Sequence, residues 1–164
     1  MKSLLPLFLL IFFSPSLWAQ DLKVQWPMGW QMEKSVNEPL KAGSAQQKTV
    51  EYWKGPEAGQ EAKLEHLPVR TPPVKIFNDF ANSRSCTELK RIFEAKGQLK
   101  EGAFASYKFL LRCPIESGYR FWVGAAVKGD KIGYLFYFTF EASDLLPEEI
   151  VGRYEQTPGY LSLK

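Results

Sequence analysis

The chain has 164 residues, with 21 basic and 18 acidic side chains and a formal net charge of +3 at pH 7. Charges of both signs are interspersed, so no cluster of basic residues suggests a nucleic-acid-binding surface. The length is typical of one domain after removal of a leader, and no repeat or low-complexity linker divides it.

The N-terminus has the pattern of a secretory signal peptide over residues 1–19. Lys2 supplies the positive charge, residues 4–13 are almost entirely apolar, and cleavage is expected between Ala19 and Gln20. The apolar run is too short for a membrane-spanning helix, which needs about 20 residues, and no cysteine follows for lipid attachment. We therefore expect a single secreted or periplasmic domain over residues 20–164, with no stable membrane insertion after cleavage.

The first part of this domain predicts short antiparallel strands. Residues 22–26 alternate between apolar and polar side chains, a Pro27-Met28-Gly29 turn follows, and residues 30–35 continue as a strand. Residues 37–47 are polar and contain Pro39 and Gly43, so a loop is expected there. Residues 48–54 and 62–69 predict a hairpin around the turn-forming residues 55–59.

Two helices are expected next. The first begins near Pro73, because proline is favoured in a first helical turn, and carries an apolar stripe ending at Phe80. The second is expected from Ser85 to Gly97. Ser85 and Glu88 have the spacing of a capping box. Cys86, Leu89 and Phe93 would share one face of that helix.

The C-terminal part predicts strands again. Residues 105–112 form a strand ended by Cys113-Pro114, and residues 119–128 and 131–140 form a tight hairpin around Gly129-Asp130. Residues 131–140 are largely apolar on both faces, which indicates a central, covered strand. A last helix is expected from Pro147 to about Gln156. The predicted fold class is α+β, an antiparallel sheet of about five to seven strands with helices packed on its faces.

Cys86 and Cys113 are the only cysteines. In an exported protein an even count indicates a disulfide, so we predict that these two residues are bonded. There is no Cys-x-x-Cys motif of a thiol oxidoreductase. Two cysteines and one histidine also make a poor zinc site, so no metal is expected.

Several of these features resemble a family of small exported bacterial proteins of unknown function. They are the Trp26-Pro27-x-Gly29-Trp30 segment, the predicted helix with Cys86, the strand ending at Cys113-Pro114 and the long hairpin that follows. The order of elements is also similar to the PsbP-like α/β/α sandwich of a photosystem II extrinsic subunit and several bacterial envelope proteins. The resemblance implies a fold, an envelope location and a role in binding or assembly, but no catalytic residues.

Candidate catalytic residues are few. His66 is the only histidine, on a predicted strand, and no nucleophile motif accompanies it. Glu33, Glu51 and Glu65 also lie on predicted strands, but the sequence pairs none of them with a partner. Phosphate-binding loops and calcium loops are absent, so no cofactor is expected.

Three functions remain open at this point. The first is a non-catalytic binding or accessory module of the cell envelope, whose partner is another envelope protein. The second is a binder of a small apolar ligand, in a cavity lined by aromatic residues such as Trp26, Trp30, Trp53 and Trp122. The third is a small hydrolase that uses His66. The first interpretation is favoured because no catalytic set of residues is evident.

Overall fold

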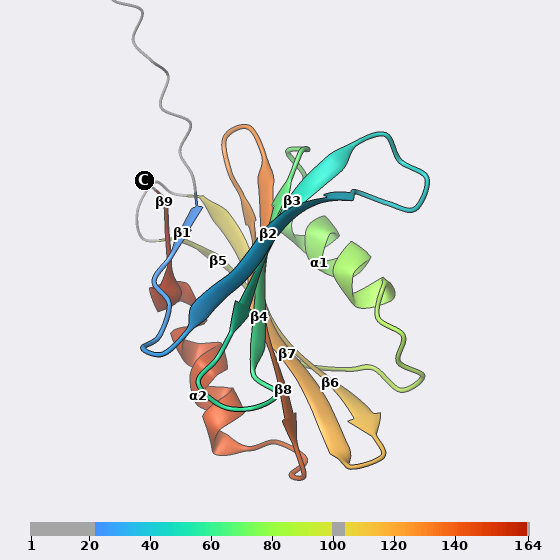
Figure 1. Ribbon diagram of the computed structural model, residues 1–164, viewed down its shortest axis with the longest axis vertical. Helices are drawn as coiled ribbons and strands as arrows, with labels where there is room; N and C mark the ends of the chain where they lie inside the picture. The colour runs from blue at the N-terminus through green and yellow to red at the C-terminus, as the bar shows by residue number, and fades with distance from the viewer. Residues whose placement is uncertain (1–21, 100–103, 164) are drawn as a thin grey trace, which may run out of the picture.

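The computed structural model describes residues 22–99 and 104–163. The predicted signal peptide and its cleavage site, between Ala19 and Gln20, lie outside these residues. Within the described ranges, nine strands form two antiparallel sheets (Figure 1). The larger sheet has seven strands in the order β2-β3-β4-β8-β7-β6-β5, and β1 pairs with β9 separately.

The strands are β1 (Leu22–Val24), β2 (Gln31–Pro39), β3 (Gln47–Lys54), β4 (Glu61–Leu67), β5 (Lys90–Gln98), β6 (Ala105–Ile115), β7 (Gly118–Lys128), β8 (Gly133–Ala142) and β9 (Leu161–Leu163). The helices are α1 (Pro73–Asn82) and α2 (Glu148–Gln156), and a 3-10 turn (Thr157–Tyr160) links α2 to β9.

Strand β8 is the fourth of the seven strands, and both of its faces are covered. Phe136 and Phe138 point to one face and Leu135 and Tyr137 to the other, and each is at most 3% exposed. Such a strand can be stable only between two layers, because either face would otherwise expose a row of large apolar side chains to water. The predicted central position of residues 131–140 is therefore confirmed.

The helices cover opposite faces of the large sheet. On one face α1 packs Phe77 against Phe109 and Phe80 against Tyr137, with ring centroids 5.0 Å and 4.6 Å apart. On the other face lie α2, through Ile150, and the small β1–β9 sheet (Figure 1). The predicted α+β class, with helices on both faces of an antiparallel sheet, is confirmed.

The two edge strands of the large sheet are irregular. A bulge interrupts the pairing of β2 between Met32 and Lys34, and another interrupts β5 between Arg91 and Phe93. Bulges and charged side chains at sheet edges hinder pairing with strands of other molecules.

The second predicted helix, from Ser85 to Gly97, is wrong. Residues 83–89 form an irregular segment, and Lys90–Gln98 is the edge strand β5, paired with β6 from Lys90 opposite Arg112. The disulfide explains the difference. It holds Cys86 at the end of β6, and from there the chain runs antiparallel to β6, so pairing with β6 replaces the helical hydrogen bonds of this segment.

Other differences concern boundaries. The predicted loop over residues 37–47 is shorter, because β2 continues to Pro39 and β3 begins at Gln47. Strand β6 continues past Cys113 to Ile115. In the last hairpin the Gly129 N–H donates to the Ile132 carbonyl at 3.0 Å, so the turn is centred one residue later than Gly129-Asp130.

Candidate ligand-binding groove

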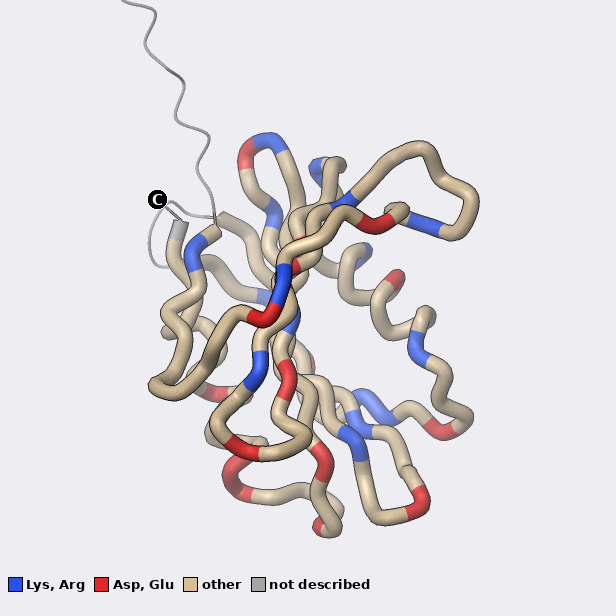
Figure 2. The backbone as a smooth tube through the Cα atoms, viewed as in Figure 1, with Lys and Arg blue, Asp and Glu red and all other residues tan. Residues whose placement is uncertain are grey.

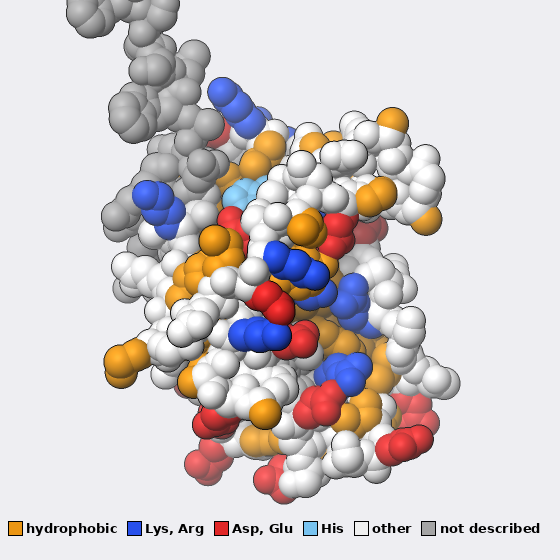
Figure 3. All heavy atoms as spheres, viewed as in Figure 1, with side chains coloured by type: hydrophobic (Ala, Val, Ile, Leu, Met, Phe, Trp, Pro, Cys, Tyr) orange, Lys and Arg blue, Asp and Glu red, His pale blue; other side chains and the backbone are white. Residues whose placement is uncertain are grey.

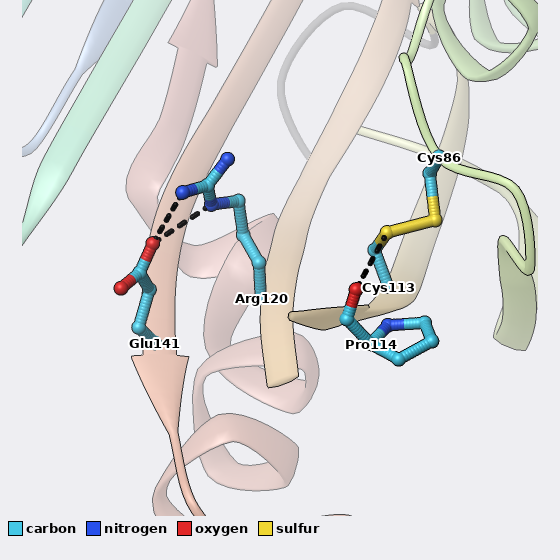
Figure 4. The surroundings of a disulfide bond; sticks show 5 residues. All are labelled: Cys86, Cys113, Pro114, Arg120 and Glu141. Atoms are coloured by element: carbon cyan, nitrogen blue, oxygen red, sulfur yellow. Dashed lines mark hydrogen bonds and ion pairs between the residues drawn. A yellow bond between two sulfur atoms is a disulfide. The ribbon is translucent and has the colours of Figure 1, made fainter. Parts of the chain in front are cut away.

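The predicted disulfide between Cys86 and Cys113 is confirmed, with the two Cα atoms 6.0 Å apart. It joins the segment after α1 to β6, rather than a helix to a strand end (Figure 4). A cavity of about 520 Å³ lies beside it, lined in part by Thr87 and Trp122. The disulfide therefore fixes the path of the chain from the end of α1 to the sheet.

A larger groove of about 940 Å³ lies on the sheet face that carries α1. Its volume is within the range of small-molecule sites, about 300–1,000 Å³. One wall is α1, another is the loop at the tip of the β2–β3 hairpin, which extends over this face (Figure 1), and β3, β4 and β8 also contribute. Six charged side chains line the groove and make it a candidate ligand site: Lys41, Lys48, Glu65, Lys75, Asp79 and Arg84.

A buried ion pair lies in the wall formed by the sheet. The Lys48 Nζ donates to the Glu65 Oε2 at 2.6 Å, and the Glu65 side chain is only 9% exposed. Lys48 on β3 is the diagonal neighbour of Glu65 on β4, since Val50 is the direct partner. The pairing neutralises a carboxylate that would otherwise be costly to bury.

The hydroxyl of Tyr137, on β8, is part of the same cluster of charges. Burial is the main reason that its pKa is raised, and the nearby Glu65 carboxylate raises it further. The Arg84 guanidinium acts in the opposite direction and favours the phenolate. Because both Glu65 and Arg84 act on this hydroxyl, Lys48, Glu65, Tyr137 and Arg84 form one electrostatic unit beneath the groove.

Arg84 is held in place by α1 and by the segment that follows it. Its guanidinium lies over the Phe80 ring at 4.4 Å from the centroid, and Nη2 donates to the Ser83 Oγ at 3.0 Å. Its Nε atom is buried without a hydrogen-bond partner among the described residues. Cys86 lies two residues further on, so the disulfide restricts the position of this side chain.

His66, the sequence candidate for catalysis, lies elsewhere. It packs against Tyr134 in the aromatic core of the α2 face, with ring centroids 5.4 Å apart, whereas the groove is on the α1 face. Its Nε2 lies 3.2 Å from the Glu51 Oε1. The hydrogen bond to His66 is the main reason that the pKa of Glu51 is lowered. His66 thus forms a side-chain contact with Glu51 on the neighbouring strand, away from the groove.

The three strand carboxylates that the sequence left unpaired each have a basic partner. Glu51 contacts His66, Glu65 contacts Lys48, and Glu33 contacts the Lys54 Nζ at 2.8 Å. Figures 2 and 3 show the same alternation on the exposed β2 side, where basic and acidic side chains are interspersed. The surface seen there has no single dominant sign of charge.

Three of the four tryptophans considered as ligand contacts pack together. The Trp26 ring stacks on Trp53 at 4.1 Å and on Trp30 at 5.9 Å, and it meets Phe136 edge-on at 5.5 Å. Neither the groove nor the cavity beside the disulfide is lined by any of these three. Trp122, in contrast, lines the cavity beside the disulfide. The tryptophan cluster forms part of the aromatic packing on the α2 face.

Residues 22–99 and 104–163 contain no group of three or more His, Cys, Asp or Glu side chains that could hold a metal ion. In the same ranges, no helix is both long and apolar enough to cross a membrane.

No family model and no curated protein sequence matches the chain. Sequence reasoning missed Lys48, Arg84 and Tyr137, because they belong to β3, the segment after α1, and β8, and only the folded chain brings them together. Of the residues in this cluster, the sequence singled out only Glu65, as a carboxylate on a predicted strand without an evident partner.

Proposed function

We propose that this protein is a non-catalytic binding module of the cell envelope, and that the groove beside α1 is its binding site. The observation that carries the proposal is the composition of the groove, in which half-buried cations lie next to apolar side chains such as Leu40 and Val69. A cavity with a few fixed polar groups in an apolar setting is the usual form of a ligand site.

The envelope location is part of the proposal. It is supported by the signal-peptide pattern of residues 1–19 and by the Cys86–Cys113 disulfide, since such bonds persist in oxidising compartments. The PsbP-like relationship is likewise a proposal. The support for it is that helices cover both faces of the central sheet, an arrangement shared by many proteins with different functions.

A hydrolase based on His66 is a weaker candidate. A nucleophilic mechanism would need a hydroxyl or thiol at the imidazole. The His66 ring contacts the Glu51 carboxylate and the Tyr134 ring. On the opposite strand its direct neighbour is Thr49, whose hydroxyl donates to the Asn37 side chain at 2.9 Å.

Native mass spectrometry of protein purified from the periplasm tests the proposal. We expect a bound small molecule in the wild-type protein. Thr71, which is half-buried and lines the groove, is replaced in the blocking variant Thr71→Trp. The matched control is Thr87→Trp, at the exposed edge of the cavity beside the disulfide.

The two variants separate the outcomes. Loss of the added mass in Thr71→Trp, with retention in Thr87→Trp, supports the groove as the site. If the wild-type chain is bare but Thr71→Trp selectively abolishes crosslinks to an envelope protein, the groove binds a protein partner instead. A bare wild-type chain whose crosslinks are unaffected by Thr71→Trp would contradict the proposal.

A further inference from the structure

The charges that line the groove do not balance. Four cations, Lys41, Lys48, Lys75 and Arg84, line it together with two acids, Glu65 and Asp79. Lys48 is paired with Glu65 at 2.6 Å and Lys75 with Asp79 at 3.2 Å. Among the described residues, no acidic side chain forms an ion pair with Lys41 or Arg84. The lining therefore has an excess of two positive charges.

The two unpaired cations differ in their surroundings. Lys41 is exposed in the hairpin loop, so water solvates its ammonium group. Arg84 is half-buried, stacked on Phe80, and bonded to the Ser83 hydroxyl. A cation that is partly removed from water without a counter-charge is a favourable place for an anion, because charge-assisted hydrogen bonds are strong there. The fixed guanidinium also loses little rotamer freedom on binding.

The apolar part of the groove adjoins this cation. Phe80 and Ile76 present the side of α1, and Leu135 belongs to the sheet opposite. Half-buried Leu40 and Val69 also line the groove. Ile76, Phe80 and Leu135 are already only 3–4% exposed, so the apolar surface that a bound chain would remove from water belongs mainly to Leu40 and Val69.

We infer that the groove binds an anionic amphiphile, a molecule in which one carboxylate or phosphate group is joined to an apolar chain. The anionic group contacts Arg84, and the chain lies along Ile76, Phe80 and Leu40. This inference rests on the proposed function, because it assigns a ligand class to the same groove.

Calorimetric titration with single-chain probes of equal length tests this assignment. The probes are dodecanoate, dodecyltrimethylammonium and dodecyl maltoside, each below its micellar concentration. We expect dodecanoate to bind the full mature chain at least about tenfold more tightly than either of the others, the effect of one hydrogen-bonded charge pair. Backbone amide shifts in NMR spectra should locate the bound dodecanoate at Leu40 and Ile76.

Arg91 offers a matched control for Arg84. Its guanidinium also lies over a phenylalanine of α1, Phe77, at 5.0 Å, but Arg91 does not line the groove. Arg84→Gln should remove the preference for dodecanoate, whereas Arg91→Gln should retain it. If Arg84→Gln fails to fold, Lys41→Gln in the exposed loop provides a second test, with an expected loss of about two- to threefold.

The results distinguish this inference from the proposed function. Binding of all three probes in the groove with equal affinity overturns the assignment of an anionic ligand but leaves the groove as a binding site. If Arg84→Gln and Lys41→Gln both bind dodecanoate with wild-type affinity, the assignment of an anionic ligand is likewise overturned, and the groove remains a binding site. If no probe shifts the backbone amide signals of the groove in NMR spectra, the result contradicts both the anionic assignment and the proposed function. Parallel sedimentation with phosphatidylglycerol or phosphatidylcholine vesicles shows whether the anionic group comes from a membrane lipid or from a free molecule.

Discussion

Loss of the Cys86–Cys113 bond should destabilise the fold by several kcal/mol. The two cysteines are 27 positions apart, so the bond closes a loop of that size in the unfolded chain. The chain-entropy model assigns about 3.5 kcal/mol to such a closure. Typical domains have a total stability of about 5–15 kcal/mol, so the loss is a large fraction of it.

The double variant Cys86→Ala/Cys113→Ala, measured by urea denaturation, provides the test. We expect the free energy of unfolding to fall by about 2–4 kcal/mol. Wild-type protein treated with a reducing agent is the control, because it loses the bond without losing side-chain volume. The losses in the free energy of unfolding should agree within about 1 kcal/mol between the two samples. Cys113 is buried, but replacing its side chain by that of alanine adds only a small packing cost.

A loss below about 1 kcal/mol in both samples would refute this reasoning. It would mean that the contacts of residues 83–89 hold the segment without the bond. The same samples address the groove, because Arg84 lies two residues before Cys86. If the disulfide positions Arg84, dodecanoate should bind the reduced, still folded protein more weakly.

Two further predictions concern single positions. A Cβ on Gly124 would lie 2.0 Å from the Phe136 carbonyl oxygen of the paired strand, so Gly124→Ala should cost about 2–3 kcal/mol in thermal unfolding. Gly152 in α2 has open space around its Cβ position, so Gly152→Ala should instead stabilise by about 1 kcal/mol. The hydrogen bond to Glu38 raises the pKa of Tyr52 to about 12. The contribution of this hydrogen bond to stability is therefore present below pH 10 and is lost as the pH rises from about 10 to about 12. In an ultraviolet titration, Tyr52 should ionise at a lower pH in Glu38→Gln than in the wild type.

The parts of the fold that were predicted correctly have strong local patterns. Residues 131–140 alternate large apolar side chains on both faces, which only a covered strand accommodates, and β8 is such a strand. Pro147 followed by Glu148 and Glu149 predicted the start of α2 for the same kind of local reason. In these segments, local preference and tertiary structure agree.

The segment from Ser85 to Gly97 shows where local patterns mislead. Its capping-box spacing and its apolar residues three and four apart are real features, but tertiary structure overrides them. The side chain of Phe93, expected on the buried side of a helix, is 39% exposed on β5. The disulfide and the unpaired edge of β6 together favour a strand, and neither is visible from the periodicity of this segment alone.

The candidate groove could not be predicted for a related reason. Its charged side chains come from β3, β4, α1 and the segments around them, and their contacts depend on strand order in the sheet. The sequence placed Glu65 on a strand without an evident partner. It did not show that Lys48 is its diagonal neighbour or that Tyr137 lies nearby.

The Lys48–Glu65 pair can show whether this region serves stability or binding. Removing only one partner, as in Lys48→Met, leaves Glu65 buried with an unpaired carboxylate and should cost about 3 kcal/mol. Replacing both, as in Lys48→Met/Glu65→Leu, removes the desolvation cost of both charges, so its stability should return to within about 1 kcal/mol of the wild type.

Dodecanoate binding should be retained in the double variant. Lys48 and Glu65 cancel each other's charge, so their joint removal leaves Arg84 in place and the excess of two positive charges in the groove unchanged. A double variant that is as unstable as Lys48→Met would show that the pair stabilises the fold in its own right. A double variant with wild-type stability but clearly weaker dodecanoate binding would show that Lys48 also contacts the anionic group, and would contradict its placement at Arg84 alone.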